Sequence, residues 1–404
     1  MEEDRMKGTY SIYITGYDWS ACSNKVLVHL EEKISEIKAS ELKVVETKNS
    51  TDFIPPKFPI TVKDFDRTVL DAYLCDENGQ VVSEPSDYFM IVLDVSPNEG
   101  SVFCFSMITQ FNTWCDPYYL TITDVNGTLE IDTTCHIKET NADRFALEEY
   151  TAKDGIKYSY VHYEPEKPSD VLVVWLHGLG EGGTEKTDAR ISVLANRVTA
   201  LIEHKFQRIV GKVNVVAPQC PTYWMDNDGT GRNLFGGKID ANEHSHYQES
   251  LYEFIMAHKQ RVGAKKVVVC GCSNGGYMTM IMAINYPKDW ACCVPICEAL
   301  DDACITDQDI EKIKDLPIYF VYSKDDPVVV PSKYEEPTIE RLKAVNAKVH
   351  VSVTDHVYDL TRKVKTPNGL PHQYMGHWSW IYFDNNETKD ENGLSAFEFI
   401  KQNI

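Results

Sequence analysis

A serine flanked by glycines carries the clearest chemical signal in the chain. Ser273 is the centre of the segment Gly271–Gly275, which reads Gly-Cys-Ser-Asn-Gly, follows the apolar run Val267–Cys270 and precedes a helix-like stretch. At a tight turn between a strand and a helix, a serine exposes its hydroxyl above the sheet, and the flanking glycines leave room for neighbouring backbone. We therefore predict that Ser273 is a nucleophile rather than a helix N-cap, and that Cys272 is a packed thiol.

Two backbone amides are expected to stabilise an oxyanion beside this serine. One is the N–H of Asn274, the next residue in the chain. The other is expected from the glycine-rich segment His177–Gly183, which follows the strand-like run Val171–Leu176. Glycines in such a loop let the backbone approach the substrate carbonyl. We assign this second donor to the N–H of Leu179.

An acid is expected after a later strand, because a nucleophile at such a turn is followed in the chain by the acid and then by the histidine. The apolar run Ile318–Tyr322 leads into Ser-Lys-Asp-Asp-Pro-Val, where Asp325 and Asp326 are adjacent. Asp326, immediately before the Pro-Val turn, is favoured as the orienting acid. Asp325 remains the alternative.

The base is expected after one further strand, predicted at residues 348–353. His356, His372 and His377 follow it. His377 is favoured because it lies in a Gly-His turn before the start of an aromatic helix. Residues 354–371 are predicted to form an excursion, an irregular segment between the last strand and the final helix. His356, immediately after the strand, is the main competitor. His377 would accept the Ser273 proton. His177 precedes the serine and is expected to brace its loop instead.

Two different patterns divide the chain into predicted domains at residues 1–140 and 141–404. Residues 9–134 consist of short alternating runs broken by turn residues, which predicts an immunoglobulin-like β-sandwich of about seven strands. From about residue 144, strands alternate with helical stretches such as Arg190–His204 and Tyr247–Arg261, typical of a doubly wound, mostly parallel sheet. The segment before Val171 is predicted to be an antiparallel hairpin.

The first half shows no cluster of chemical groups. We expect it to serve packing or assembly into a homo-oligomer, in preference to carbohydrate binding, which the aromatic residues Trp114, Tyr118 and Tyr119 would support.

The bulk composition excludes several classes of partner. The formal net charge of -21 would repel nucleic acid and anionic membranes, and no apolar stretch approaches the length of a membrane-spanning helix. We therefore expect a cytoplasmic protein. Five of the twelve cysteines lie in apolar runs of the second half, where they are expected to be small buried thiols that suit a reducing compartment. The cysteine spacing does not fit a zinc site. No metal or cofactor is expected.

The motifs around Gly178, Ser273, Asp326 and His377 resemble those of the esterase and polyhydroxybutyrate-depolymerase branch of the α/β hydrolases, which is related to prolyl-oligopeptidase-like peptidases. The whole chain looks like two-domain bacterial carboxylesterases with an N-terminal immunoglobulin-like domain. In such relatives the extra domain is associated with oligomer assembly and with access to the site.

The resemblance also places residues 217–229 beside the active site. Trp224 and Met225 would then form an apolar wall for the substrate, or would simply pack beneath the loop; Trp378, next to the base, is a further candidate for substrate binding. The leading hypothesis is a serine carboxylesterase acting on acetyl, short-acyl or feruloyl-type esters. A prolyl-oligopeptidase-like peptidase and a non-catalytic scaffold protein are the alternatives.

Overall fold

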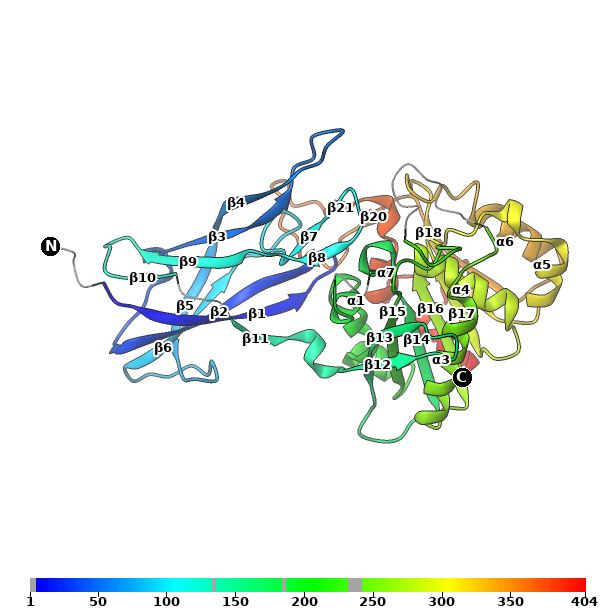
Figure 1. Cartoon of the computed structure of the whole chain (residues 1–404), viewed down its shortest axis with the longest axis horizontal. Coiled ribbons are helices and arrows are strands. Elements are labelled where there is room, and N and C mark those ends of the chain that lie inside the picture. The colour runs from blue at the N-terminus through cyan, green and yellow to red at the C-terminus, as the bar shows by residue number, and fades with distance from the viewer. Residues whose placement is uncertain (1–4, 133–135, 184–186, 232–241) are drawn as a thin grey trace. The chain divides into compact units, whose positions relative to one another are not determined.

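A computed structural model describes residues 5–132, 136–183, 187–231 and 242–404. The chain divides into two compact units (Figure 1). The first contains Met1–Ile108 and Asn112–Asp143, and the second contains Thr109–Phe111 and Arg144–Ile404. Residues 133 and 134, at the end of the predicted β-rich stretch, lie outside the described residues.

The first unit contains a five-stranded and a four-stranded sheet. In spatial order, the five-stranded sheet consists of β11 (His136–Thr140), β1 (Gly8–Gly16), β2 (Ala21–Ile34), β6 (Ser86–Leu93) and β5 (Val69–Cys75). The four-stranded sheet consists of β10 (Glu130–Ile131), β9 (Tyr118–Asp124), β3 (Leu42–Thr51) and β4 (Ile60–Arg67). A separate hairpin joins β7 (Phe103–Phe105) to β8 (Asn112–Trp114).

The two sheets of the first unit pack as a sandwich. Tyr10 of β1 is buried, and its hydroxyl accepts a 2.6 Å hydrogen bond from the backbone N–H of Leu120 in β9 of the other sheet. Strands β1, β2, β5 and β6 share one sheet while β3, β4 and β9 share the other, which is the division found in immunoglobulin-like sandwiches. There are more strands than predicted, partly because the chain crosses between sheets at Thr68, where β4 ends and β5 begins.

The three aromatic residues considered for carbohydrate binding do not form an exposed platform. Tyr118 is half-buried, and its hydroxyl donates a 2.7 Å hydrogen bond to the buried carboxylate of Glu46. Trp114 packs edge-on against Phe103, with 4.8 Å between ring centroids. Only Tyr119 of the three is exposed.

The second unit is built on one eight-stranded sheet. Its first two strands form the antiparallel hairpin predicted before Val171, and from β14 onward the neighbours are parallel. The spatial order is β12 (Ala146–Thr151), β13 (Lys157–Tyr163), β15 (Asn214–Gln219), β14 (Val171–Leu176), β16 (Lys266–Cys272), β17 (Cys292–Ile296), β18 (Ile318–Ser323) and β19 (Val349–Thr354). Two short strands, β20 (Val357–Tyr358) and β21 (Gln373–Tyr374), form a small antiparallel pair. Strand β20 lies within the predicted excursion of residues 354–371, and β21 follows just after it.

Helices follow most of these strands. They are α1 (Arg190–Ala195), α2 (His204–Ile209), α3 (Gln248–Arg261), α4 (Asn274–Asn285), α5 (Asp307–Ile313), α6 (Glu335–Ala344), α7 (Trp380–Asp384) and α8 (Ala396–Asn403). The prediction of one helix over Arg190–His204 was wrong. Arg197 adopts a left-handed φ of 49°, which ends α1 and starts the 3-10 turn Val198–Ile202.

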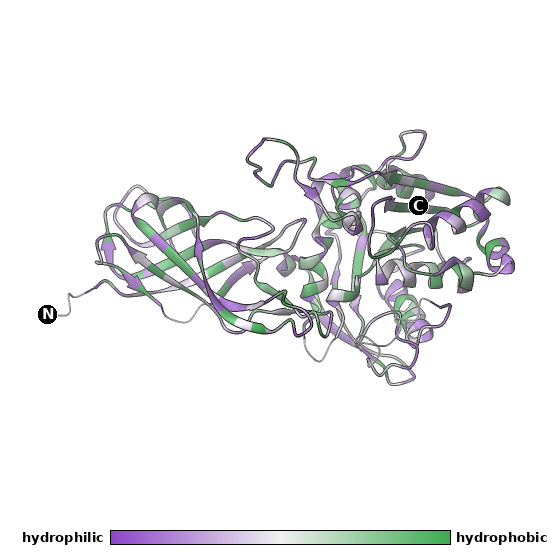
Figure 2. Cartoon of the chain, turned by 90° about the horizontal axis from the view of Figure 1, so that it is seen from above, coloured by the Kyte–Doolittle hydropathy of each residue, from purple (hydrophilic) through white to green (hydrophobic). Residues whose placement is uncertain are grey.

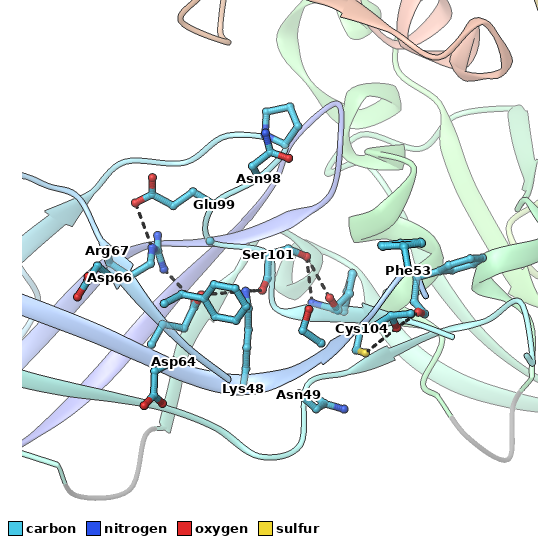
Figure 3. A pocket seen from close by; sticks show the side chains of 18 residues that line it. Lys48, Asn49, Phe53, Asp64, Asp66, Arg67, Asn98, Glu99, Ser101 and Cys104 are labelled. Carbon is cyan, nitrogen blue, oxygen red and sulfur yellow. Dashed lines mark hydrogen bonds and ion pairs between the residues drawn. The ribbon is translucent and has the colours of Figure 1, made fainter. Parts of the chain in front are cut away.

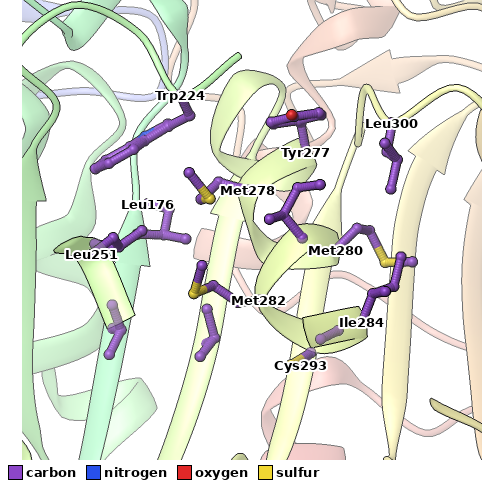
Figure 4. Packing of buried hydrophobic residues seen from close by; sticks show 14 of the residues in the cluster. Leu176, Trp224, Leu251, Tyr277, Met278, Met280, Met282, Ile284, Cys293 and Leu300 are labelled. Carbon is purple, nitrogen blue, oxygen red and sulfur yellow. The ribbon is translucent and has the colours of Figure 1, made fainter. Parts of the chain in front are cut away.

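The core of the second unit lies between α4 and the sheet. Met278, Met280 and Met282 of α4 are buried with Leu176 of β14 and Cys293 of β17 (Figure 4). Hydrophobic residues gather in the strands of this unit (Figure 2). This is expected of parallel strands, which are covered on both faces and are therefore apolar along their length. This packing holds the carboxyl ends of β14, β16 and β18 in fixed positions, and these ends carry the candidate site.

Neither unit contains, within its described residues, a helix long and apolar enough to cross a membrane. Eleven cysteines fall in the described residues, and these eleven are free thiols. Burial raises the pKa of Cys272, next to Ser273, well above its usual value, so this thiol stays protonated and unreactive, as the sequence predicted.

Candidate active site

Ser273 occupies a strained turn between β16 and α4. Its φ of 54° and ψ of -116° are unusual for a residue with a side chain. The backbone N–H of Ser273 donates a 2.8 Å hydrogen bond to the carbonyl of Ile296 in the neighbouring strand. A Cβ on Gly271 would lie 2.7 Å from the Leu176 carbonyl oxygen, and one on Gly275 would lie 2.6 Å from that of His177. The two glycines therefore permit the tight turn that presents the serine.

His377 and Asp326 complete a hydrogen-bonded group with Ser273. The Nε2 atom of His377 lies 2.9 Å from Ser273 Oγ, and its Nδ1 atom lies 2.7 Å from Asp326 Oδ2. The other carboxylate oxygen of Asp326 accepts hydrogen bonds of 2.8 and 2.9 Å from the N–H groups of Val328 and Val329. Asp326 is thus oriented by the turn that follows it, and it can in turn orient the imidazole.

The two competing residues, Asp325 and His356, pair with each other instead. His356 Nδ1 lies 2.7 Å from Asp325 Oδ2, and Ser323 Oγ donates a 2.6 Å hydrogen bond to Asp325 Oδ1. Burial favours the protonated form of Asp325, but the hydrogen bonds from His356 and Ser323 prevail and lower its pKa. The adjacent aspartates therefore face different histidines: Asp326 is hydrogen-bonded to His377, and Asp325 to His356.

Asp325 also lies against the turn that carries His377. A Cβ on Gly376 would collide with the Asp325 carboxylate and would lie 2.7 Å from its backbone carbonyl carbon. Gly376 thus lets the segment before His377 pass close to the end of β18. The short 3-10 turn Gly376–Trp378 and helix α7 then continue from this point.

The loop predicted to hold Leu179 lies beside the serine turn. A Cβ added to Gly178 would lie 3.7 Å from the Cys272 sulfur, in the residue before Ser273. Leu179 begins the 3-10 turn Leu179–Glu181, and Asn274 begins helix α4. Both predicted oxyanion donors are therefore backbone N–H groups at the start of a helical turn, where the amides lack a partner within the turn.

His177 braces this loop. Its Nε2 accepts a 2.9 Å hydrogen bond from the backbone N–H of Cys220, which leaves Nδ1 to donate a 2.6 Å bond to the Gly178 carbonyl. The ring is fully buried, and burial lowers its pKa to about 4 despite the hydrogen bond to Gly178. His177 therefore stays neutral and fixed, which suits a structural role.

The expected substrate wall requires a correction. Trp224 is 0% exposed and Met225 is 6% exposed, and both belong to the hydrophobic core. Sequence reasoning missed a contact that explains this burial: the side-chain oxygen of Asn274 accepts a 2.6 Å hydrogen bond from the Trp224 backbone N–H. Packing beneath the loop is therefore the role the structure supports for Trp224 and Met225. Trp378 is half-buried and retains accessible surface.

A cavity of about 530 Å³ lies within the sandwich of the first unit (Figure 3). Its cations are already paired: Arg67 Nη1 and Lys48 Nζ lie 2.9 and 2.8 Å from the two carboxylate oxygens of Glu46. Arg67 Nη2 also donates to the carbonyls of Ser23 and Asp94, at 2.9 Å each. This network stabilises the sandwich, and we assign the cavity no ligand.

The fold and the group around Ser273 define a serine hydrolase of the α/β-hydrolase class. Residues 159–361 match the model of the phospholipase/carboxylesterase family, and this match covers half of the chain. The chain belongs to this family. His377 lies beyond the matched residues, so its place beside Ser273 is known from the structure alone.

A solved structure of an esterase shares this fold. It is described as a thermostable esterase and has a TM-score of 0.68 at 20% identity, and the match covers 94% of this chain and 96% of that one. At that identity the likeness shows the fold, here across both units. The match to a ferulic acid esterase covers 64% of this chain and 98% of that one, at 10% identity and a TM-score of 0.44. A likeness this weak carries no argument about the substrate. A comparison with curated proteins gave no match.

Proposed function

We propose that the protein is a serine carboxylesterase that cleaves small to medium acyl or aromatic esters through an acyl-enzyme on Ser273. The observation that carries this proposal is the continuous hydrogen-bonded path from Ser273 Oγ through His377 to Asp326, with distances of 2.9 and 2.7 Å. Hydroxyl, imidazole and carboxylate in this order are the parts needed for nucleophilic acyl transfer.

In this mechanism, His377 Nε2 takes the hydroxyl proton as Ser273 Oγ attacks the ester carbonyl carbon. The carbonyl oxygen becomes an oxyanion, which the N–H groups of Leu179 and Asn274 stabilise. Collapse of the tetrahedral intermediate breaks the ester bond, and His377 gives the proton to the leaving alcohol. A water molecule then attacks the acyl-enzyme with His377 again as base, which releases the carboxylic acid and restores Ser273. Asp326 holds the Nδ1 proton throughout.

Exposed apolar side chains that lie close in the chain to the acid and the base support an apolar ester group. Val328, two residues after Asp326, is 57% exposed, and Met375, two residues before His377, is 43% exposed. Covering an exposed apolar side chain with an apolar substrate group is favourable, because it removes apolar surface from water. Acetyl, short-acyl and feruloyl-type esters fit this environment. Trp378 would contribute to binding of the same group.

The test is hydrolysis of p-nitrophenyl acetate and butyrate by the wild type, Ser273→Ala and the exposed-serine control Ser332→Ala. Loss of the nucleophile is expected to lower kcat by at least about 10⁴-fold, while the control keeps the wild-type rate. Wild-type turnover by Ser273→Ala would refute the proposal. The peptidase alternative predicts faster cleavage of a p-nitroanilide than of the matched ester, and the scaffold alternative predicts no ester turnover by the wild type.

The residues named in this mechanism belong to the second unit. We propose that the first unit serves assembly into a homo-oligomer, which the exposed apolar side chains of Phe53, Ile54 and Val62 support. Sedimentation of the full chain tests this directly: an oligomer is expected, and a monomer at micromolar concentration would contradict it.

A further inference from the structure

The loop between β7 and β8 contributes a phenylalanine to the core of the second unit. Thr109–Phe111, at the end of this loop, are part of the second unit, although the strands that flank them belong to the first. Phe111 is 6% exposed and belongs to the same hydrophobic cluster as Leu176, at the end of β14, and Trp224. Phe111 is therefore a core residue of the unit that carries Ser273.

The ring of Phe111 lies against two glycines of the loop that follows β14. A Cβ on Gly183 would lie 3.0 Å from Phe111 Cε2 and 3.1 Å from Phe111 Cδ2. A Cβ on Gly182 would lie 3.3 Å from Phe111 Cε1. Contacts of a Cβ atom in a packed core are rarely this short, so the ring occupies space that a larger residue would need. The two glycines thus present bare backbone to the ring.

The same two glycines also contact the segment that follows β15. The backbone N–H of Gly183 donates a 3.0 Å hydrogen bond to the carbonyl of Cys220. A Cβ on Gly182 would lie 2.0 Å from the carbonyl oxygen of Thr222. The backbone of Gly182 and Gly183 is therefore packed against the segment after β15 and against the Phe111 ring at once. Removing the ring would free this backbone to move away from β15.

The two glycines are joined to Leu179, the residue proposed above as an oxyanion donor. Leu179 begins the 3-10 turn Leu179–Glu181, and the N–H of Gly182 donates a 3.3 Å hydrogen bond back to the Leu179 carbonyl. At the end of the turn, Gln219 Nε2 donates a 3.0 Å hydrogen bond to the Glu181 carbonyl. The place of the glycines therefore sets the place of the turn. Stabilisation of an oxyanion depends closely on where its donors lie, so a small shift of this turn matters.

The backbone just before Phe111 is strained. Gln110 has a left-handed φ of 59°, which is uncommon for a residue with a side chain. Such a conformation is kept only where the surroundings hold it, and the buried ring of Phe111 is anchored directly after it. The local backbone is therefore committed to placing this ring on the glycines.

We propose that Phe111 is a positioning residue for the oxyanion loop, defined here as His177–Gly183. Its ring keeps Gly182 and Gly183 against the segment after β15, and so holds the N–H of Leu179 where the oxyanion of the substrate forms. Phe111 acts through the loop and takes no part in bond making or breaking. The catalytic part of this inference rests on the proposed function, whereas the seating of the loop does not.

Phe111→Ala removes the ring and leaves Ser273, His377 and Asp326 unchanged. The kcat for p-nitrophenyl acetate should fall about 10- to 100-fold, because a displaced oxyanion donor loses much of its effect on the transition state. KM should change less than about threefold, since the oxyanion exists only after the attack on the ester. Phe111→Leu, which restores apolar volume beside the glycines, should recover much of the lost kcat.

Phe206→Ala is the matched control for the loss of a buried ring. Phe206 is 0% exposed in the same unit and packs edge-on against Phe397, with 4.7 Å between ring centroids. Both alanine variants should lower the urea midpoint, but Phe206→Ala should keep the wild-type kcat under conditions where it is folded. If an alanine variant does not fold, Phe111→Leu and Phe206→Leu give the same comparison. A wild-type kcat in Phe111→Ala, or equal losses of kcat at the two positions, would overturn the proposal.

Hydrogen–deuterium exchange tests the seating of the loop whether or not the chain hydrolyses esters. Peptides that cover His177–Gly183 should exchange faster in Phe111→Ala than in the wild type, while Phe206→Ala leaves their exchange unchanged. Faster exchange in Phe111→Ala together with a wild type that cleaves no ester would support the seating of the loop and refute the proposed function. Unchanged exchange of these peptides in Phe111→Ala would overturn the role of Phe111 regardless of activity.

Discussion

Replacing Asp326 by asparagine changes the tautomer of His377 while leaving the shape of the site intact. The asparagine oxygen can still accept the N–H groups of Val328 and Val329, at 2.8 and 2.9 Å. Its amide then faces His377 Nδ1, which lies 2.7 Å from the present carboxylate oxygen. Because the amide donates, Nδ1 must accept, and the ring proton moves to Nε2. That atom faces Ser273 Oγ and can no longer take its proton. We expect kcat to fall by about 10⁴-fold, or ~5.5 kcal/mol in the activation free energy.

The matched control for this variant is Asp325→Asn. Asp325 pairs with His356, which is exposed, and such pairs contribute about 0 to 1 kcal/mol. We therefore expect less than about a fivefold change in kcat. The assay is p-nitrophenyl butyrate hydrolysis, with circular dichroism to show that both variants are folded. Equal losses in the two variants, or less than a tenfold loss in Asp326→Asn, would refute the assignment of the acid.

Three further predictions concern packing and stability. Gly275→Ala should lower kcat by about 10²-fold or more, because the new Cβ would collide with the Leu176 carbonyl and displace the serine turn; wild-type kinetics and an unchanged unfolding midpoint would contradict this. Arg67→Met should lower the free energy of unfolding by about 3 to 5 kcal/mol in urea titrations, since it leaves the buried Glu46 without its guanidinium partner; a loss under 1 kcal/mol would show that the network is dispensable. The ten cysteines that are buried among the described residues should react with iodoacetamide only after denaturation. Native protein that carries the label at any of these ten, as located by mass spectrometry, would count against their burial.

The meeting of Ser273 and His377 in the structure was predictable because local chemistry restricts both positions. A serine between glycines at the junction of strand and helix leaves few alternatives, and the order of the three groups along the chain excludes His177. Asp326 was harder to assign, since Asp325 is its neighbour and chain order cannot separate them. The choice depends on the side chain's direction, which is set by hydrogen bonds to the turn that follows.

Features that depend on tertiary packing were not predictable in the same way. The loop that buries Trp224 is held by core packing and by a hydrogen bond to Asn274, which lies 50 residues away in the chain. A left-handed residue at Arg197 interrupts a stretch whose hydrophobic pattern indicates one helix.

The central claim is that Ser273 is the nucleophile of an acyl-transfer site. The most direct measurement is reaction of the native chain with a fluorophosphonate probe, followed by proteolysis and mass spectrometry to locate the adduct. We predict a single adduct on the peptide containing Ser273, no labelling of Ser273→Ala, and labelling slowed by several orders of magnitude in His377→Ala. An adduct on another residue, or equal labelling of Ser273→Ala and the wild type, would contradict the account.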